Sequence, residues 1–409
     1  MTAPRPIARG LPPAFWWLWS GIVVNRTTGF IVPYLSIWLT RDHGFSAAAA
    51  GAIASAYGAG AIAGSLSGGV VADRVGRRFA LLLGLCGSTA AVFALAFAPL
   101  ALLPALVLAA GFFGESYRAP SLAAVADLVP AEDRERAFGL VYWGVNLGFA
   151  AGGAAAGLLA SISTQLLFCA DAATTLAFAG IVALRVPETR PIDQPAGHPL
   201  AETLRGLVAT FRDRHLSAFL GFTFVAFLVF MQLNVALPLD VASKGFGPST
   251  LGAIFTVNGV LITLLQPFAA RALAAVDRGR LIAGAIAVVG LGFLLHGPAA
   301  TAPAFAVAVA IWTLGEIAWL PPSSTLVADL SPLALRGRYQ GAYSTCVSLA
   351  AFVAPLVGPA LHARVGSVAF WAGCCAVAFV AAGGQLAIAG PRRRHLAIQD
   401  PLPRARIEG

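Results

Sequence analysis

Val125-Ala126-Asp127-Leu128-Val129-Pro130 recurs almost unchanged 202 residues later as Val327-Ala328-Asp329-Leu330-Ser331-Pro332. Each copy ends an apolar run. Each is also followed, at the same spacing, by two arginines and a glycine: Arg134, Arg136 and Gly139, then Arg336, Arg338 and Gly341. Upstream, Gly114-Glu115 is matched by Gly315-Glu316. A helix-loop-helix element that returns after about half the chain indicates two related halves.

The amino-acid composition indicates whether the surface of these halves faces water or lipid. Of the 409 residues, 58% are hydrophobic and 11% charged, and the mean hydropathy is +0.80. Soluble domains average about 25% charged and about 45–50% apolar residues. So little charge cannot cover a surface in water, so most of the surface is expected to face lipid. We predict an all-α membrane protein with twelve transmembrane helices in two six-helix pseudo-repeat halves.

Apolar runs place the spans and the domain boundaries. The N-terminal half covers 1–186, a cytoplasmic linker 187–215, the C-terminal half 216–390 and a cytoplasmic tail 391–409. The linker is rich in proline and charge, with a short interfacial helix expected at 200–211. The predicted spans are 14–40, 47–72, 79–98, 102–126, 137–162, 165–186, 216–240, 249–270, 280–297, 304–328, 339–362 and 366–390.

The net charge of +9 follows the predicted topology. Most of the 27 Lys and Arg residues fall in the tails and in the loops on one side of the membrane, whereas Arg41, Lys244 and Arg364 fall on the other. Basic loops stay in the cytoplasm, so both termini are expected there. The basic charge is thus explained without nucleic acid, and we expect no such partner.

The loop between the second and third spans carries the pattern Gly69-x-x-x-Asp73-Arg74-x-Gly76-Arg77-Arg78. A glycine allows close helix packing, a second glycine a sharp turn, and the cations hold the loop at the cytoplasmic face. The pattern resembles the signature loop of the major facilitator superfamily, and the resemblance extends over nearly the whole chain. It implies that Asp73 and Arg77, with Asp127, form a conformational latch between the halves.

Within that superfamily the chain looks most similar to bacterial drug and metabolite exporters of the proton-antiporter branch. The fifth span, Gly148-x-x-x-Gly152-Gly153-x-x-Ala156-Gly157, is similar to their antiporter motif. It departs from the motif in having Gly153 where proline is usual and Ala156 where glycine is usual.

Charged residues inside predicted spans are candidates for function because a charge at mid-bilayer is costly. Arg26 and Glu115 both lie about 18 Å from a helix end at 1.5 Å per residue, so they are expected to pair, with Arg118 one turn from Glu115. Glu316 lies at the matching depth in the second half, where no intramembrane cation is evident. A carboxylate without a partner favours its protonated form. The proton-coupling candidates are therefore Glu316, then Glu115, then Asp171; a structural hydrogen-bonded acid is the alternative for each.

Other polar and aromatic residues of the spans are candidates for the substrate cavity, although helix–helix hydrogen bonds explain polar amides equally well. With Arg26 and Arg118 they are Asn25, Tyr57, Tyr142, Trp143, Asn146, Gln232, Asn234, Asn258 and Trp319.

No enzyme motif and no nucleotide-binding loop is found, so we expect a non-enzymatic transporter driven by an ion gradient, without a cofactor. The leading hypothesis is proton-coupled efflux of small organic or amphipathic compounds by alternating access. A proton-coupled importer or uniporter, and a non-transporting receptor or scaffold, are the alternatives. The expected partners are a small-molecule substrate, protons and the lipid bilayer, with the protein a monomer in a bacterial plasma membrane.

Overall fold

The computed structural model describes residues 10–130, 133–190, 205, 208–273, 276–332 and 335–399, and this part of the chain is helical without strands. The first half holds α1 (Pro13–Arg26), α2 (Ile31–Arg41), α3 (Ala47–Arg74), α4 (Arg77–Phe97), α5 (Leu103–Ser116), α6 (Arg118–Leu128), α7 (Arg134–Ile162) and α8 (Thr164–Arg185). The second half holds α10 (Arg214–Phe230), α11 (Gln232–Ser243), α12 (Pro248–Ala272), α13 (Arg278–Leu294), α14 (Ala302–Leu330), α15 (Arg336–Val365) and α16 (Ser367–Gln399).

The predicted all-α membrane fold is confirmed. Eleven helical segments of the described chain are long and apolar enough to cross a membrane. The twelfth predicted span, 280–297, corresponds to α13, whose 17 residues fall short of that length. It still packs along α14 and α16, and turns extend it to Pro298. The interfacial helix expected at 200–211 lies largely outside the described residues, of which 208–210 are helical.

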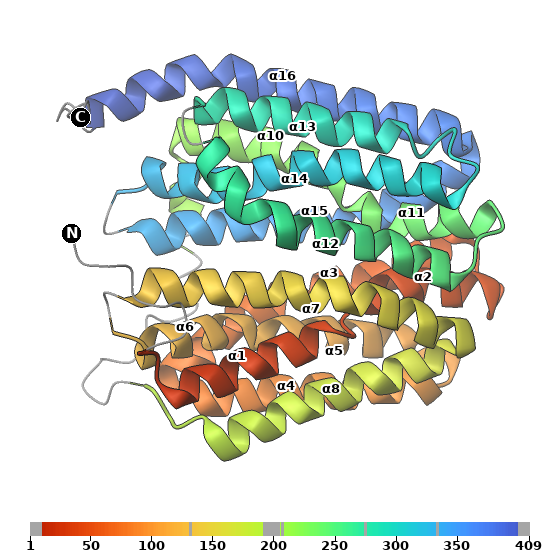
Figure 1. Cartoon of the computed structure of the whole chain (residues 1–409), viewed down its shortest axis with the longest axis horizontal. Helices are drawn as coiled ribbons and strands as arrows, with labels where there is room; N and C mark the ends of the chain where they lie inside the picture. The colour runs from red at the N-terminus through yellow and green to blue at the C-terminus, as the bar shows by residue number, and fades with distance from the viewer. Residues whose placement is uncertain are drawn as a thin grey trace.

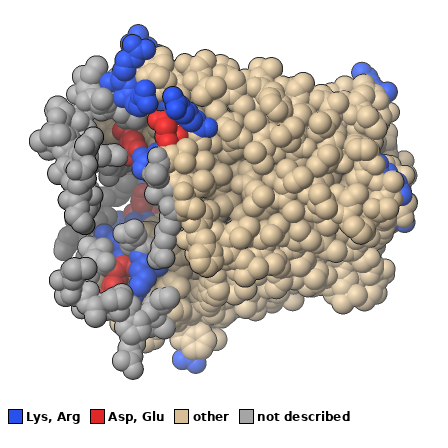
Figure 2. All heavy atoms as spheres, turned by 45° about the horizontal axis from the view of Figure 1, so that its top comes forward, with Lys and Arg blue, Asp and Glu red and all other residues tan. Residues whose placement is uncertain are grey.

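The two halves lie side by side, with α1–α8 in one layer and α10–α16 in the other (Figure 1). Helix α1 begins and α16 ends at the same end of the molecule (Figure 1). Lys, Arg, Asp and Glu gather at one end in Figure 2, with a few basic residues at the other end. The broad uncharged band between them has the character of a surface that faces lipid.

Three predicted spans are interrupted near their middle. α1 and α2 are separated by residues 27–30, α5 and α6 by Tyr117, and α10 and α11 by Met231. Proline explains the first two breaks: Pro33 cannot donate to the carbonyl of Gly29, and Pro120 cannot donate to that of Ser116. The break at Met231 falls 202 residues after Gly29, so the two halves are interrupted at equivalent positions.

Glycine stripes bring helix backbones into contact within the first half. A Cβ atom on Gly60, Gly64 or Gly68 of α3 would collide with the backbone of α5 at Leu108, Phe112 and Ser116, respectively. The stripe therefore fixes α3 against α5, since only glycine permits this approach.

Other glycines form the seam between the halves. A Cβ on Gly58 of α3 would lie 2.6 Å from the Cα of Phe352 in α15, and one on Gly157 of α7 would lie 2.8 Å from the Cα of Gly252 in α12. Tyr34 of α2 donates from its hydroxyl to the carbonyl oxygen of Pro248, at 3.2 Å. These contacts lie toward the end of the molecule away from the chain termini. The structure is thus a form in which the halves meet at that end, the extracellular end in the expected topology.

The α3–α5 packing can be tested with alanine. We expect Gly64→Ala to lower the melting temperature in detergent, because the added methyl group overpacks a backbone contact at a cost of about 1–3 kcal/mol. Gly180→Ala in α8 is the matched control, since no atom lies within 4 Å of its added Cβ. It should leave stability unchanged or raise it, because alanine is the better helix former. Equal melting temperatures for the two variants would contradict the assigned role of the stripe.

Candidate functional site: a cavity between the halves

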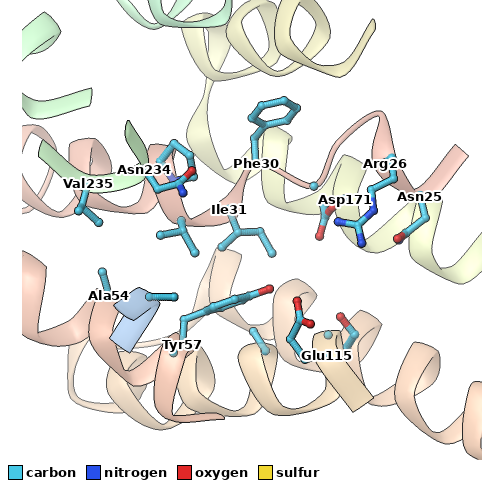
Figure 3. A pocket seen from close by; sticks show the side chains of 18 of the residues that line it. Asn25, Arg26, Phe30, Ile31, Ala54, Tyr57, Glu115, Asp171, Asn234 and Val235 are labelled. Atoms are coloured by element: carbon cyan, nitrogen blue, oxygen red, sulfur yellow. The ribbon is translucent and has the colours of Figure 1, made fainter. Parts of the chain in front are cut away.

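A cavity of about 210 Å³ lies at the level of the helix breaks, between the two halves. Its polar lining comes from α1, α3, α5, α8 and α11, and its apolar lining includes Phe30, Ile31 and Val235 (Figure 3). Six of the residues proposed from the sequence share this lining: Asn25, Arg26, Tyr57, Glu115, Asp171 and Asn234. The cavity is therefore polar on the side of the first half.

Hydrogen bonds fix the broken first span against α8. The Asn25 side-chain nitrogen donates to the Thr175 hydroxyl at 2.8 Å, and the Asn25 side-chain oxygen accepts from the Tyr117 hydroxyl at 2.7 Å. The hydroxyls of Thr28 and Thr174 are 2.6 Å apart. Both side-chain groups of Asn25 are thus occupied, so Asn25 holds the wall of the cavity in place.

The ion pair of Glu115 differs from the expected one. Its Oε2 lies 2.8 Å from Nη1 of Arg118, and no ion pair between Glu115 and Arg26 occurs in the described chain. The break at Tyr117 places Arg118 at the start of α6, three residues beyond Glu115. Arg26 instead lies beside Asp171, with both side chains facing the cavity from above Glu115 in Figure 3.

Glu316 in the second half has a hydrogen bond but no cation. Its Oε2 accepts from the side-chain nitrogen of Asn258 at 2.8 Å, and that nitrogen also lies 3.0 Å from the Thr313 hydroxyl. Within the described residues, no Lys, Arg or His nitrogen lies within 4.0 Å of the Glu316 carboxylate. Tyr142 of α7 lies within electrostatic range of the Glu316 carboxylate. Glu316 does not line the cavity of Figure 3.

Several other candidates lie away from that cavity. Trp319 is fully buried against Phe227, with ring centroids 4.6 Å apart. Trp143 stacks on Trp19 at 6.4 Å. The remaining two, Gln232 and Asn146, donate to backbone carbonyls: Gln232 to those of Leu228 and Ala354, and Asn146 to that of Tyr142. Their types suited a cavity, but the sequence does not show which face of a helix is covered by its neighbours.

The signature loop forms a compact charged cluster at the end where the chain termini lie. Arg77 pairs with Asp73 and, through its Nε, with Oδ2 of Asp127 at 3.3 Å. Gly76 has a φ of 145°, a value that favours glycine. No atom lies within 4 Å of a Cβ built on Gly69, so in this form no helix packs closely there.

A second segment, not included among the candidate site residues, completes the cluster. Glu188 accepts the backbone N–H of Arg77 at 2.8 Å and that of Arg78 at 3.1 Å, which caps the first turn of α4. Arg190 Nη1 donates to the carbonyl of Arg74 at 2.6 Å. These contacts join the first half to the start of the linker and do not reach the second half. In the second half Arg278 pairs with Asp329, the repeat counterpart of Asp127.

A helical membrane protein built from two six-helix halves around a polar central cavity has the form of a transporter. The family profile of the Major Facilitator Superfamily matches residues 18–239 and 218–402, so the chain belongs to that family.

Curated relatives agree with this membership. The chain is 28% identical over 360 residues to the uncharacterized MFS-type transporter YttB of Bacillus subtilis, covering 87% of this chain and 90% of the relative. It is 28% identical over 353 residues to the class C tetracycline resistance protein of Escherichia coli, covering 83% and 87%. A Na(+), Li(+), K(+)/H(+) antiporter of Planococcus maritimus is 23% identical over 367 residues, covering 82% and 86%.

A crystal structure of the peptide transporter POT in complex with alafosfalin shares the fold, with a TM-score of 0.79 and 16% identity over 95% of this chain and 96% of that chain.

The Glu188 cap predicts a pH-dependent stability. Partial burial acts to raise the pKa of Glu188, but four backbone N–H donors outweigh it and lower the pKa below its usual value. A lowered pKa means that the carboxylate stabilises the fold above about pH 4.5 and that this contribution is lost as pH falls through the lowered pKa. We expect Glu188→Gln to cost about 1 kcal/mol at pH 7, as for a lost helix cap, and to approach wild type as the pH falls through the lowered pKa of Glu188.

Melting temperatures measured from pH 7 down to well below the usual glutamate pKa of about 4.5 test this effect. Asp42→Asn, which alters an exposed acid at the opposite end of the bundle, serves as the control and should show no such convergence. A Glu188→Gln deficit that stays constant over this pH range would remove the role of the charge.

Proposed function

We propose that this member of the superfamily is a proton-coupled exporter of small organic or amphipathic compounds that works by alternating access. The supporting observation is the contrast between two membrane carboxylates at matching positions of the repeat. Glu115 is paired with Arg118, whereas the hydrogen-bond partner of Glu316 among the described residues is the neutral Asn258. An arginine holds its partner ionised, but a carboxylate bonded to an amide can gain and lose a proton without leaving a cation unpaired.

Protons are then exchanged for substrate because the protein carries the substrate in one direction and the proton in the other. In the inward-facing form the substrate enters the cavity between Arg26, Glu115 and Asn234 while Glu316 releases its proton to the cytoplasm. In the outward-facing form the substrate leaves and Glu316 takes up a proton from outside. The protein returns inward with its carboxyl group neutral, which avoids moving a bare charge through lipid.

The relatives support the direction and the substrate class of this proposal. One is named for tetracycline resistance and another for cation/proton antiport. Both names describe proteins that share the fold and most of the length of this chain. We place this protein in the cell membrane with its termini in the cytoplasm and expect it to act as a monomer.

Efflux is tested directly in cells. We expect expression of the protein to lower the accumulation of at least one compound in a panel that includes tetracycline and ethidium, and an uncoupler to restore accumulation to that of the vector control. Uptake of a panel compound that expression increases would favour the importer. An effect that the uncoupler leaves unchanged would favour a uniporter. If the normally expressed protein changes the accumulation of no compound in a broad panel, the proposed export is contradicted.

Glu316→Gln should abolish uphill transport in proteoliposomes with an imposed pH gradient and spare counterflow, because the amide cannot carry a proton. Glu115→Gln serves as the matched comparison. The Arg118 side chain is 57% exposed, so its loss of a partner should cost only about 1 kcal/mol, and uphill transport should persist. If Glu316→Gln still concentrates substrate with the pH dependence of wild type, the proton is carried elsewhere, with Glu115 and then Asp171 next to be tested.

A further inference from the structure

One buried carboxylate joins three elements of the second half, at the end opposite to that where α1 begins and α16 ends. Asp240 of α11 is fully buried. Its Oδ1 lies 3.0 Å from Nε2 of His362 in α15, and its Oδ2 accepts from Nε1 of Trp371 in α16 at 3.0 Å. Its Oδ2 also lies 3.1 Å from Nζ of Lys244. A charge this deeply buried is tolerated only when it is paired and hydrogen-bonded, and Asp240 satisfies both conditions.

Lys244 extends the cluster to a further element. Its Nζ donates to the carbonyl oxygens of His296 at 2.6 Å and Gly297 at 3.0 Å, in the turn that follows α13. All of these partners belong to the second half. Together, Asp240, Lys244, His362 and Trp371 are called the Asp240 cluster below, and the cluster ties α11 to α13, α15 and α16.

The Asp240 cluster matters because the apolar contacts of α11 do not determine which half α11 moves with. α11 contacts α2 of the first half and α15 of the second. Val235 packs into the apolar cluster of the first half, whereas Leu237 and Val241 pack into that of the second. The break at Met231 separates α11 from α10, so α11 is a helix segment of its own.

Among the described residues of the first half, no buried ion pair holds α2 in the same way. The repeat counterpart of Asp240 is Trp38 of α2, whose Nε1 is buried without a hydrogen-bond partner. Within its own half α2 makes apolar contacts such as that of Trp38 with Phe168, with ring centroids 5.6 Å apart, and its Tyr34 donates to Pro248 of the second half. A cleft of about 610 Å³ between the halves is lined by Arg41 and Ser243 and reaches His362, so the Asp240 cluster lies directly beneath this seam.

We propose that Asp240 is a positioning residue for transport, which makes α11 move with α15 and α16 so that the closed end opens between α2 and α11. Without the tie, α11 can remain on α2 when the second half moves away. The seam would then stay covered although the halves had separated.

The experiment needs neither a substrate nor a proton gradient, so its failure is distinct from failure of the proposed export. Gly58→Trp supplies a wedge, because any side chain at Gly58 meets the backbone of Phe352 and must push α15 away from α3. Nitroxide labels on Asp42→Cys and Arg364→Cys report the distance from α2 to α15. Labels on Asp42→Cys and Ser243→Cys report the distance from α2 to α11. The background replaces the native cysteines, which are Cys86, Cys169, Cys346, Cys374 and Cys375.

In the wedge protein we expect both distances to lengthen. Adding Asp240→Asn should leave the α2–α15 shift and remove the α2–α11 shift. Trp38→Phe, at the counterpart position, should behave like the wedge protein alone. Lys244 is the protein's single lysine, so its labelling by an amine reagent checks the tie directly. Labelling should accelerate about tenfold in Asp240→Asn, the factor for 1.4 kcal/mol of lost interaction.

Two results would overturn the proposal: an α2–α11 shift that persists in full with Asp240→Asn, or a wedge that leaves the α2–α15 distance unchanged. If Asp240→Asn alone fails to fold, Asp240→Asn with Lys244→Met removes both charges and leaves no ammonium unpaired. The same loss of the α2–α11 shift is expected in that double variant, and its retention would equally contradict the proposal.

Discussion

The hydrocarbon core of a membrane offers a charge neither a counter-ion nor a hydrogen bond. This constraint divides the ionisable groups of the protein into those that are paired and those that are not. A charged side chain inside a span must find its counter-ion and its hydrogen bonds within the protein. Glu115 finds Arg118, and Asp240 finds Lys244, His362 and Trp371. The buried Asp240 is committed to structure, because removing one partner would leave the other unpaired, whereas the exposed Arg118 loses little without Glu115. Glu316, hydrogen-bonded to Asn258 and without a cation within 4.0 Å among the described residues, is the acid that we propose changes its protonation.

Properties that run along the chain were predictable from the sequence, whereas contacts across the fold were not. Hydropathy and the 202-residue repeat predicted two related helical halves, and depth along a helix placed Arg26 and Glu115 near one cavity. The sequence placed Arg118 one turn from Glu115 but did not show that Arg118 and not Arg26 is the partner of Glu115. The Asp240 cluster joins residues more than 100 positions apart, and no local pattern marks them as neighbours.

The faces of helices were a second limit. Trp319 and Tyr142 are both aromatic residues in spans, yet Trp319 is packed against Phe227 in the core of its half while Tyr142 is exposed and within electrostatic reach of Glu316. With a hydrophobic residue at almost every position, a transmembrane helix lacks the polar face that orients a helix in a soluble protein. Glycine gives better guidance, because close backbone contact requires it: the stripe on α3 did lie against another helix.

The repeat gives the two halves the same helices and the same interrupted first helix, but it does not give them the same polar groups. The first half concentrates charge at mid-membrane, around Arg26, Glu115 and Arg118, and holds its end segment α2 with apolar contacts. The second half has the lone Glu316 at mid-membrane and places its strongest polar cluster at the end of α11. If the two halves were equivalent, the closed end could open with α11 staying on α2, or with α2 staying on α11. An asymmetric tie removes this ambiguity, because a buried ion pair within one half costs more to break than apolar contacts between halves cost to slide.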